Sequence, residues 1–273
     1  MIEARKVAGA LGAEISGVDL SRPLPKADFA EVKRLWLEHL VIFFRGQKLN
    51  DGQYMAFAEQ FGEPVEYPYV QGIPGYPKII EVKKLEHERV AFGGIWHTDT
   101  AYLERPPMAS MLLALEIPPF GGDTLFANMY LAFESLSGGM QKLLLNLKAI
   151  NSSTKADASN TREDAKKSSG KETKDYTAEH PVVRTHPETG RKALYVNSGH
   201  TVRFAGWTEE ESAPLLRFLY DWQVRPEFTC RFAWQPGSIA LWDNRCAQHN
   251  PVNDYHGHRR LMHRITLAGD VPA

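Results

Sequence analysis

The stretch FTCRFAWQPGSIALWDNRCAQHNPVNDYHGHRRLMHRITL, residues 228 to 267, decides the fold of this chain. Three strand-like runs lie in it, at residues 228–234, 238–242 and 260–267. Turn residues separate them, at Gln235-Pro236-Gly237 and around 254–258. Short strands punctuated by turns are typical of all-β sandwiches and barrels. We therefore expect a mainly β fold with helices, a double-stranded β-helix (jelly roll, cupin-like) core that carries helical insertions.

Apolar periodicity places the helices. Residues 40–44, LVIFF, read as a buried strand. Pro214 disfavours a helix that begins at the capping-box pattern of Thr208, so the last helix should begin near Ala213. The predicted helical regions are 26–40, 50–60 with Asn50 or Asp51 as its cap, 130–147 with a break at Gly138-Gly139, and 213–222.

Length and composition set the class of protein. The 273 residues and 43% hydrophobic content fit one large domain, residues 1–273, with a substantial core. A net charge of −1 argues against nucleic acid and anionic membranes as partners. Two cysteines do not form a disulfide framework, and the sequence shows neither a secretory signal nor an apolar span, so we expect a cytoplasmic location. Residues 151–179 are strongly polar, and we expect either a mobile lid loop or a solvated surface loop.

The tripeptide His97-Thr98-Asp99 is a candidate metal site. If residues 94–102 form a strand, the side chains of His97 and Asp99 point the same way and can hold one ion. Two imidazoles and one carboxylate leave three positions open on non-haem Fe(II). The similar triplet His186-Pro187-Glu188 instead reads as a loop between two strands, because Pro187 and the following residues favour a turn.

Further residues can complete this site. His249 lies at the end of the strand-like residues 239–244 and can face inward at the mouth of a barrel. Arg260 and Arg264 fall on one face of the next predicted strand. Two inward arginines need anions, which are either carboxylates of the protein or a bound dicarboxylic co-substrate.

The sequence resembles the TauD/TfdA family of Fe(II)/2-oxoglutarate-dependent dioxygenases, which includes taurine and aryloxyalkanoate dioxygenases. The likeness covers nearly the whole chain. It rests on the segments GALGAEISGVDLSRPL, VIFFRGQ, FGEP, WHTD, PPFGGDTLF, HPVVRTHPETGRKALYVN, WDNRCAQHN and RRLMHRITLAGD.

The resemblance implies roles for individual residues. His97, Asp99 and His249 would hold iron, and Thr124 and Arg260 would bind the distal carboxylate of 2-oxoglutarate. The co-substrates O2 and 2-oxoglutarate would yield succinate and CO2 while a carbon of a small anionic organic substrate is hydroxylated. The family also implies a homo-oligomer.

Arg264 would bind the acidic group of the substrate, which would be a sulfonate, a sulfate ester, an aryloxyalkanoate or another carboxylate. The corresponding pocket positions are Tyr67, Val70, Phe92, Gly93 and His200. They are roomier and more apolar than those of taurine-using relatives, so taurine is not the expected best substrate. The alternatives are oxidation of an amino-acid-like or phosphonate substrate, a non-catalytic ligand-binding jelly roll, and a zinc hydrolase.

Overall fold

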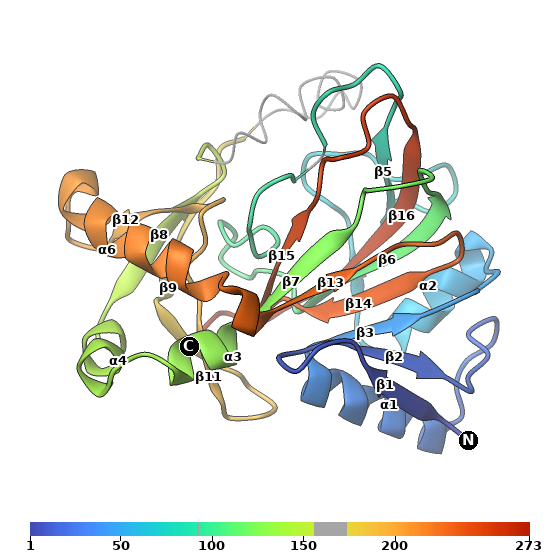
Figure 1. Cartoon of the computed structure of the whole chain (residues 1–273), viewed down its shortest axis with the longest axis horizontal. Helices are drawn as coiled ribbons and strands as arrows, with labels where there is room; N and C mark the ends of the chain where they lie inside the picture. The colour runs from blue at the N-terminus through green and yellow to red at the C-terminus, as the bar shows by residue number, and fades with distance from the viewer. Residues whose placement is uncertain (92, 156–173) are drawn as a thin grey trace.

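The computed structural model describes residues 1–91, 93–155 and 174–273 (Figure 1). Its largest sheet contains β1 (Glu3–Lys6), β2 (Ala13–Ser16), β3 (Val41–Phe44), β4 (Pro64–Val65), β5 (Ile79–Lys84), β6 (Ala109–Glu116), β14 (Ile239–Asp243) and β16 (Arg260–Leu267). These strands follow the order β1-β2-β3-β14-β6-β16-β4, and β5 also pairs with β16. Except for the parallel β2–β3 pair, the neighbours are antiparallel.

A second sheet packs on this one and closes the jelly roll. It consists of β7 (Thr124–Asn128), β13 (Thr229–Phe232) and β15 (Ala247–Pro251), in the order β13-β7-β15. Aromatic rings join the two sheets: Phe43 of β3 stacks on Phe232 at 3.9 Å and meets Phe126 edge-on at 5.7 Å between centroids. The fold is mainly β with a jelly-roll core, as the sequence predicts.

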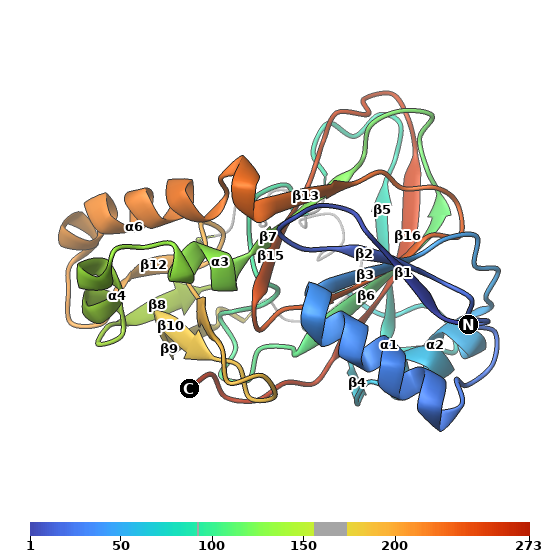
Figure 2. The same ribbon diagram turned by 60° about the horizontal axis from the view of Figure 1, so that its bottom comes forward.

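The central strand β3 is buried on both faces of the large sheet, which explains why it is apolar throughout. Val41 and Phe43 of β3 belong to the core between the sheets, whereas Ile42 and Phe44 pack on the opposite face. That opposite face is covered by α1 (Lys26–His39) and α2 (Asp51–Glu59), as Figure 2 shows. The predicted helices at 26–40 and 50–60 and the strand at 40–44 are confirmed.

The remaining elements form a lobe beside the two sheets, on the left of Figure 1. They are α3 (Met129–Glu134), α4 (Gly138–Leu144), β8 (Lys148–Ser152), β9 (Thr177–Pro181), β10 (Val183–Thr185), β11 (Lys192–Leu194), β12 (Thr201–Phe204), α6 (Glu209–Gln223) and the 3-10 helix η1 (Pro226–Phe228). Strands β12, β8 and β9 form a sheet, and β10 pairs with β11 as a hairpin. The loop prediction for His186-Pro187-Glu188 is confirmed, since these residues connect β10 and β11.

Three boundary predictions are wrong. Residues 94–102 are not a strand, because only His97 makes a bridge before the chain turns. Helix α6 begins at Glu209 rather than near Ala213, with Pro214 inside it. The break in the helical region falls at residues 135–137, and Gly138 begins α4 instead of ending a helix, because the Ser137 side chain caps that turn.

Other predictions have mixed outcomes. Residues 156–173 of the predicted 151–179 lid lie outside the described residues, and its two ends are ordered in β8 and β9. Both cysteines, Cys230 and Cys246, are free and buried. Over the described ranges, no helix combines the length and apolarity needed to cross a membrane. The organisation of residues 1–273 as one domain stays a prediction.

Candidate active site

Three potential metal ligands converge at the mouth of the jelly roll. His97, Asp99 and His249 are all buried, and their ligand atoms lie within 4.8 Å of one another. The Oδ1 atom of Asp99 is 3.6 Å from Nε2 of His97 and 3.9 Å from Nε2 of His249. Two imidazoles and a carboxylate at these separations can face one ion and leave part of its coordination sphere open.

Main-chain pairing holds the two histidines together. The His97 amide donates to the His249 carbonyl at 3.0 Å, and the His249 amide donates back at 2.9 Å. His249 therefore belongs to β15 in the smaller sheet, not to the end of the strand at 239–244 as the sequence suggested. Asp99 follows on a turn in which Thr100 has a positive φ of 41°. The turn, rather than strand alternation, brings Asp99 beside His97.

The protonation of the histidines suits a metal. The Nδ1 atom of His97 lies 2.7 Å from the Ile95 carbonyl oxygen, which can only accept, so Nδ1 donates to it and Nε2 is the nitrogen on the Asp99 side. Burial, with the nearby His97, lowers the pKa of His249 well below its usual value. Burial thus favours the neutral form of His249, which is the form that binds a metal.

Asp99 has two further polar partners. Arg264 lies 2.8 Å from Oδ1, and the Ser110 hydroxyl donates to Oδ2 at 2.7 Å. Burial acts to raise the pKa of Asp99, but the charge of Arg264 and the neighbouring histidines outweigh it and hold the pKa well below the usual range. Arg264, predicted to meet a substrate anion, here pairs with Asp99, which is the protein-carboxylate alternative raised from the sequence.

Arg260 differs from Arg264 in having no such partner. It is buried, and within the described part of the chain its Nε and Nη2 atoms have no hydrogen-bond partner. Burial lowers its pKa, against the influence of Tyr255. A buried, incompletely paired guanidinium is costly unless an anion joins it. Arg260 is therefore the strongest candidate for an anion-binding residue in this part of the molecule.

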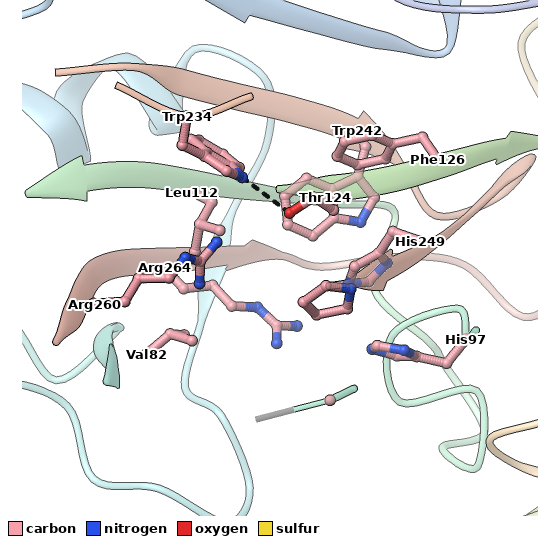
Figure 3. Close-up of a pocket in the computed structure, with 12 residues that line it drawn as sticks. Val82, His97, Leu112, Thr124, Phe126, Trp234, Trp242, His249, Arg260 and Arg264 are labelled. Atoms are coloured by element: carbon pink, nitrogen blue, oxygen red, sulfur yellow. Dashed lines mark hydrogen bonds between the residues drawn. The ribbon is translucent and has the colours of Figure 1, made fainter. Parts of the chain in front are cut away.

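One pocket joins these groups. Figure 3 shows Arg260, Arg264 and Thr124 on one side of it and the two histidines on the other. The Trp234 indole donates to the Thr124 hydroxyl at 3.0 Å. The lining residues are Val82, Gly93, His97, Leu112, Thr124, Phe126, Trp234, Trp242, His249, Pro251, Arg260 and Arg264. Six of the predicted site residues therefore line this pocket: Gly93, His97, Thr124, His249, Arg260 and Arg264. Asp99 is not among the lining residues, but it pairs with Arg264.

The predicted substrate-contact residues are distributed unevenly. Gly93 lines the pocket. Tyr67 lies under Arg264, with its ring centroid 5.3 Å from the guanidinium carbon, and Val70 packs in the same cluster. The His200 ring is 5.9 Å from that of His97. Tyr67, Val70 and His200 are not part of the pocket wall, and Phe92 lies outside the described residues.

Three buried residues near the site were not predicted from the sequence. Ser110 and Asn244 surround Asp99, and the Asn244 amide donates to the Ser110 hydroxyl at 3.0 Å. Lys84 is also buried and sits directly opposite Arg260 in the β5–β16 register, with its ammonium 4.4 Å from the centroid of the Tyr255 ring. Ser110 lies within an apolar strand and Lys84 follows another lysine, so only the pairing of strands brings them here. The WDNR segment that contains Asn244 was the one available signal.

A second cluster of potential metal ligands already contains an arginine side chain as its cation. His186, Asp243 and Cys246 lie within 4.8 Å of one another. However, Arg245 binds Asp243 through two nitrogens at 2.7 and 2.8 Å, and His186 approaches the same carboxylate at 3.0 Å. The guanidinium neutralises Asp243, so the cluster is a structural ion network.

Comparison with known proteins agrees with this geometry. Residues 3–266 match the model of the taurine catabolism dioxygenase TauD, TfdA family. The chain belongs to this family. The dioxygenase is 39% identical to an alkylsulfatase of Acinetobacter baylyi, with 99% of this chain and 86% of the relative covered. It is 37% identical to an alpha-ketoglutarate-dependent sulfate ester dioxygenase of Pseudomonas putida, covering 99% and 91% of the two chains.

Solved structures give the same result. A crystal structure described as a putative alpha-ketoglutarate-dependent taurine dioxygenase from Burkholderia xenovorans superposes with a TM-score of 0.87 at 37% identity, covering 100% of this chain and 94% of that one. The dioxygenase is thus an enzyme of the alpha-ketoglutarate-dependent class, and its family chemistry requires 2-oxoglutarate and O2.

Proposed function

We propose that this enzyme uses Fe(II), 2-oxoglutarate and O2 to hydroxylate a carbon of a small or medium anionic organic substrate, with sulfate esters as the preferred class. One observation carries the proposal: His97 and His249, which lie beside Asp99, line the same pocket as the incompletely paired guanidinium of Arg260. A metal site and an anion site so close together suit a co-substrate that chelates at one end and carries a carboxylate at the other.

In this proposal His97, Asp99 and His249 hold the metal. The Nε2 atom of His97, whose Nδ1 is fixed by the Ile95 carbonyl, and the ionised carboxylate of Asp99 fit a divalent cation. When bound, Fe(II) supplies a centre at which O2 and a keto acid react together. Zinc accepts the same ligand types, but the zinc hydrolase raised as an alternative has no role for Arg260 or for the family relationship.

Arg260 and Thr124 are proposed to bind the distal carboxylate of 2-oxoglutarate. Thr124 lines the pocket with Arg260, and Trp234 already donates to its hydroxyl oxygen, so the hydroxyl proton is free to turn toward an acceptor. The guanidinium can hold a carboxylate through two parallel hydrogen bonds.

Arg264 is proposed to bind the anionic group of the prime substrate. Its side chain lines the pocket while its Nη2 atom rests on Asp99, so a substrate anion would share or replace that partner. Tyr67, Val70, Phe92, Gly93 and His200 are proposed to surround the rest of the substrate. The names of the two relatives at 39% and 37% identity support a sulfate ester over taurine.

Two measurements test the proposal. Anaerobic addition of Fe(II) and 2-oxoglutarate should give a weak visible charge-transfer band, and its absence from folded, metal-loaded protein would argue for a binding protein or another metal. A succinate-release screen should then rank alkyl sulfates above taurine. Faster succinate release with taurine, an aryloxy acid, an amino acid or a phosphonate would reassign the substrate. The homo-oligomer and the cytoplasmic location stay predictions.

A further inference from the structure

A chain of hydrogen bonds ends on the oxygen of Asp99 that does not face the histidines. Oδ1 is the atom near His97 and His249, whereas Oδ2 accepts the Ser110 hydroxyl at 2.7 Å. Ser110 in turn accepts from the Asn244 amide nitrogen at 3.0 Å. All of these side chains are buried, so water does not compete for their hydrogen bonds.

The direction of every proton in this chain is fixed. The Trp242 indole can only donate, and it lies 3.0 Å from Oδ1 of Asn244. That contact orients the amide and leaves its NH2 group facing Ser110 as a donor. Ser110 therefore accepts from Asn244 through its hydroxyl oxygen and donates its single proton to Asp99. We call the sequence Trp242, Asn244, Ser110, Asp99 the indole relay.

We propose that Ser110 and Asn244 are positioning residues that make Asp99 offer Oδ1 alone to the metal. The terminal torsion of an aspartate is soft, so an unrestrained carboxylate can turn to present both oxygens. A hydrogen bond to Oδ2 opposes that rotation. Binding through one oxygen keeps three positions for the co-substrates, while binding through two would occupy a further one. This inference rests on the proposed function.

Arg264 cannot supply the same restraint. It contacts Oδ1, the oxygen on the histidine side, and lies 3.5 Å from the Ser110 hydroxyl. In the proposed function a substrate anion binds to Arg264, so the contact between Arg264 and Asp99 depends on whether substrate is bound. The hydrogen bond from Ser110 to Oδ2 needs no substrate anion, because both of its atoms belong to the protein.

The test compares two buried serines. Ser110→Ala removes the donor to Asp99, and Ser212→Ala is the matched control, because Ser212 is equally buried but bonds Thr208 and Phe204 in the distant α6 region. Metal-free samples of wild type and both variants are titrated with Mn(II). Outer hydrogen-bond partners of metal ligands are typically worth about 10- to 100-fold in metal affinity. We expect at least a tenfold rise in the Mn(II) Kd for Ser110→Ala and less than a twofold change for Ser212→Ala.

A second measurement separates positioning from stability. With Mn(II) saturating, the Kd of 2-oxoglutarate should rise about fivefold or more in Ser110→Ala, because a carboxylate bound through both oxygens obstructs the chelating end. Ser110→Thr keeps the hydroxyl and should restore both constants. If Ser110→Ala does not fold, Asn244→Asp replaces the amide donor by an acceptor of the same shape and should weaken Mn(II) binding in the same direction.

The outcomes separate the two proposals. Unchanged Mn(II) and 2-oxoglutarate constants in Ser110→Ala, or in Asn244→Asp if that variant replaces it, overturn the positioning role while the proposed function stands. A wild-type enzyme that binds neither Mn(II) nor 2-oxoglutarate overturns the proposed function itself.

Discussion

At the scale of single residues, two buried arginines on one strand differ in whether a carboxylate of the protein pairs with them. Arg264 has a carboxylate partner in Asp99, whereas Arg260 keeps Nε and Nη2 unpaired. Strand alternation predicted that both would face inward, because their spacing is even. It could not predict which one the protein would pair, since Asp99 arrives from a turn far away in the sequence.

This difference predicts separable effects of two substitutions. Arg260→Ala should raise the Kd of 2-oxoglutarate about 30-fold, since a hydrogen-bonded charge contributes about 2 kcal/mol. Arg264→Ala should raise the KM of the prime substrate and change 2-oxoglutarate binding much less. Calorimetry with Mn(II)-loaded protein measures the first effect, and steady-state succinate release measures the second. Equal losses for both ligands in both variants would contradict the division of roles.

Gly93 gives a second residue-scale prediction. Its φ is 72°, and a Cβ at this position would lie 3.1 Å from Cε1 of His97. Gly190 is the matched control, because its φ of 70° is similar and a Cβ there would meet nothing within 4 Å. Both alanine substitutions should cost about 1–2 kcal/mol of unfolding free energy from the left-handed backbone alone. Only Gly93→Ala should also weaken Mn(II) binding, and equal Mn(II) affinities for the two variants would show that His97 adapts freely.

At the scale of elements, local signals were sufficient where a helix carries its own cap. Asn50, one of the two residues predicted as the cap of α2, is that cap and forms a capping box with Gln53. The same signal at Thr208 was outweighed in the sequence by Pro214, yet α6 begins at Glu209. Pro214 removes only one amide donor, which would have bonded the carbonyl of the exposed Glu210, so water can serve that carbonyl instead. The conformation of the segment with His97 and Asp99 could not be predicted from local sequence, because its one β-bridge is made with His249 of β15.

The start of α6 can be tested through its cap. Thr208 accepts from the Glu211 amide, and the Glu211 carboxylate accepts from the Thr208 amide. Thr208→Ala should therefore lower the unfolding free energy by about 1 kcal/mol, measured by urea denaturation. A helix that began near Ala213 would make this substitution neutral.

At the scale of the whole molecule, a buried ion network joins three distant parts of the chain. Asp243 ends β14, His186 lies in the β10–β11 hairpin, and Arg245 reaches Glu188 of that hairpin at 2.8 Å. Lys33 of α1 binds the same Glu188 at 2.7 Å. The lobe, the jelly roll and the helix on its outer face thus meet at one set of charges.

Asp243→Asn should be strongly destabilising, by about 3–5 kcal/mol, because it leaves Arg245 buried without its main anion. Burial acts to raise the pKa of Asp243, but Arg245 and His186 outweigh it and lower the pKa below the usual value. A lowered folded-state pKa means that the stabilisation is present above about pH 4 and is lost as the pH falls. Urea unfolding between pH 7 and pH 3 should show a smaller loss of stability in Asp243→Asn than in wild type. Parallel pH profiles would place the acid sensitivity elsewhere.

The reciprocal main-chain hydrogen bonds between His97 and His249 allow the opening of the site to be followed by hydrogen exchange at their two amides. These two main-chain hydrogen bonds attach His97 to β15, so both amides can exchange with solvent deuterium only when that pairing opens. A ligand shared by the two imidazoles would slow both exchange rates by the same factor. Amide exchange at these two backbone positions would then measure how often the pairing of His97 with His249 opens in this dioxygenase.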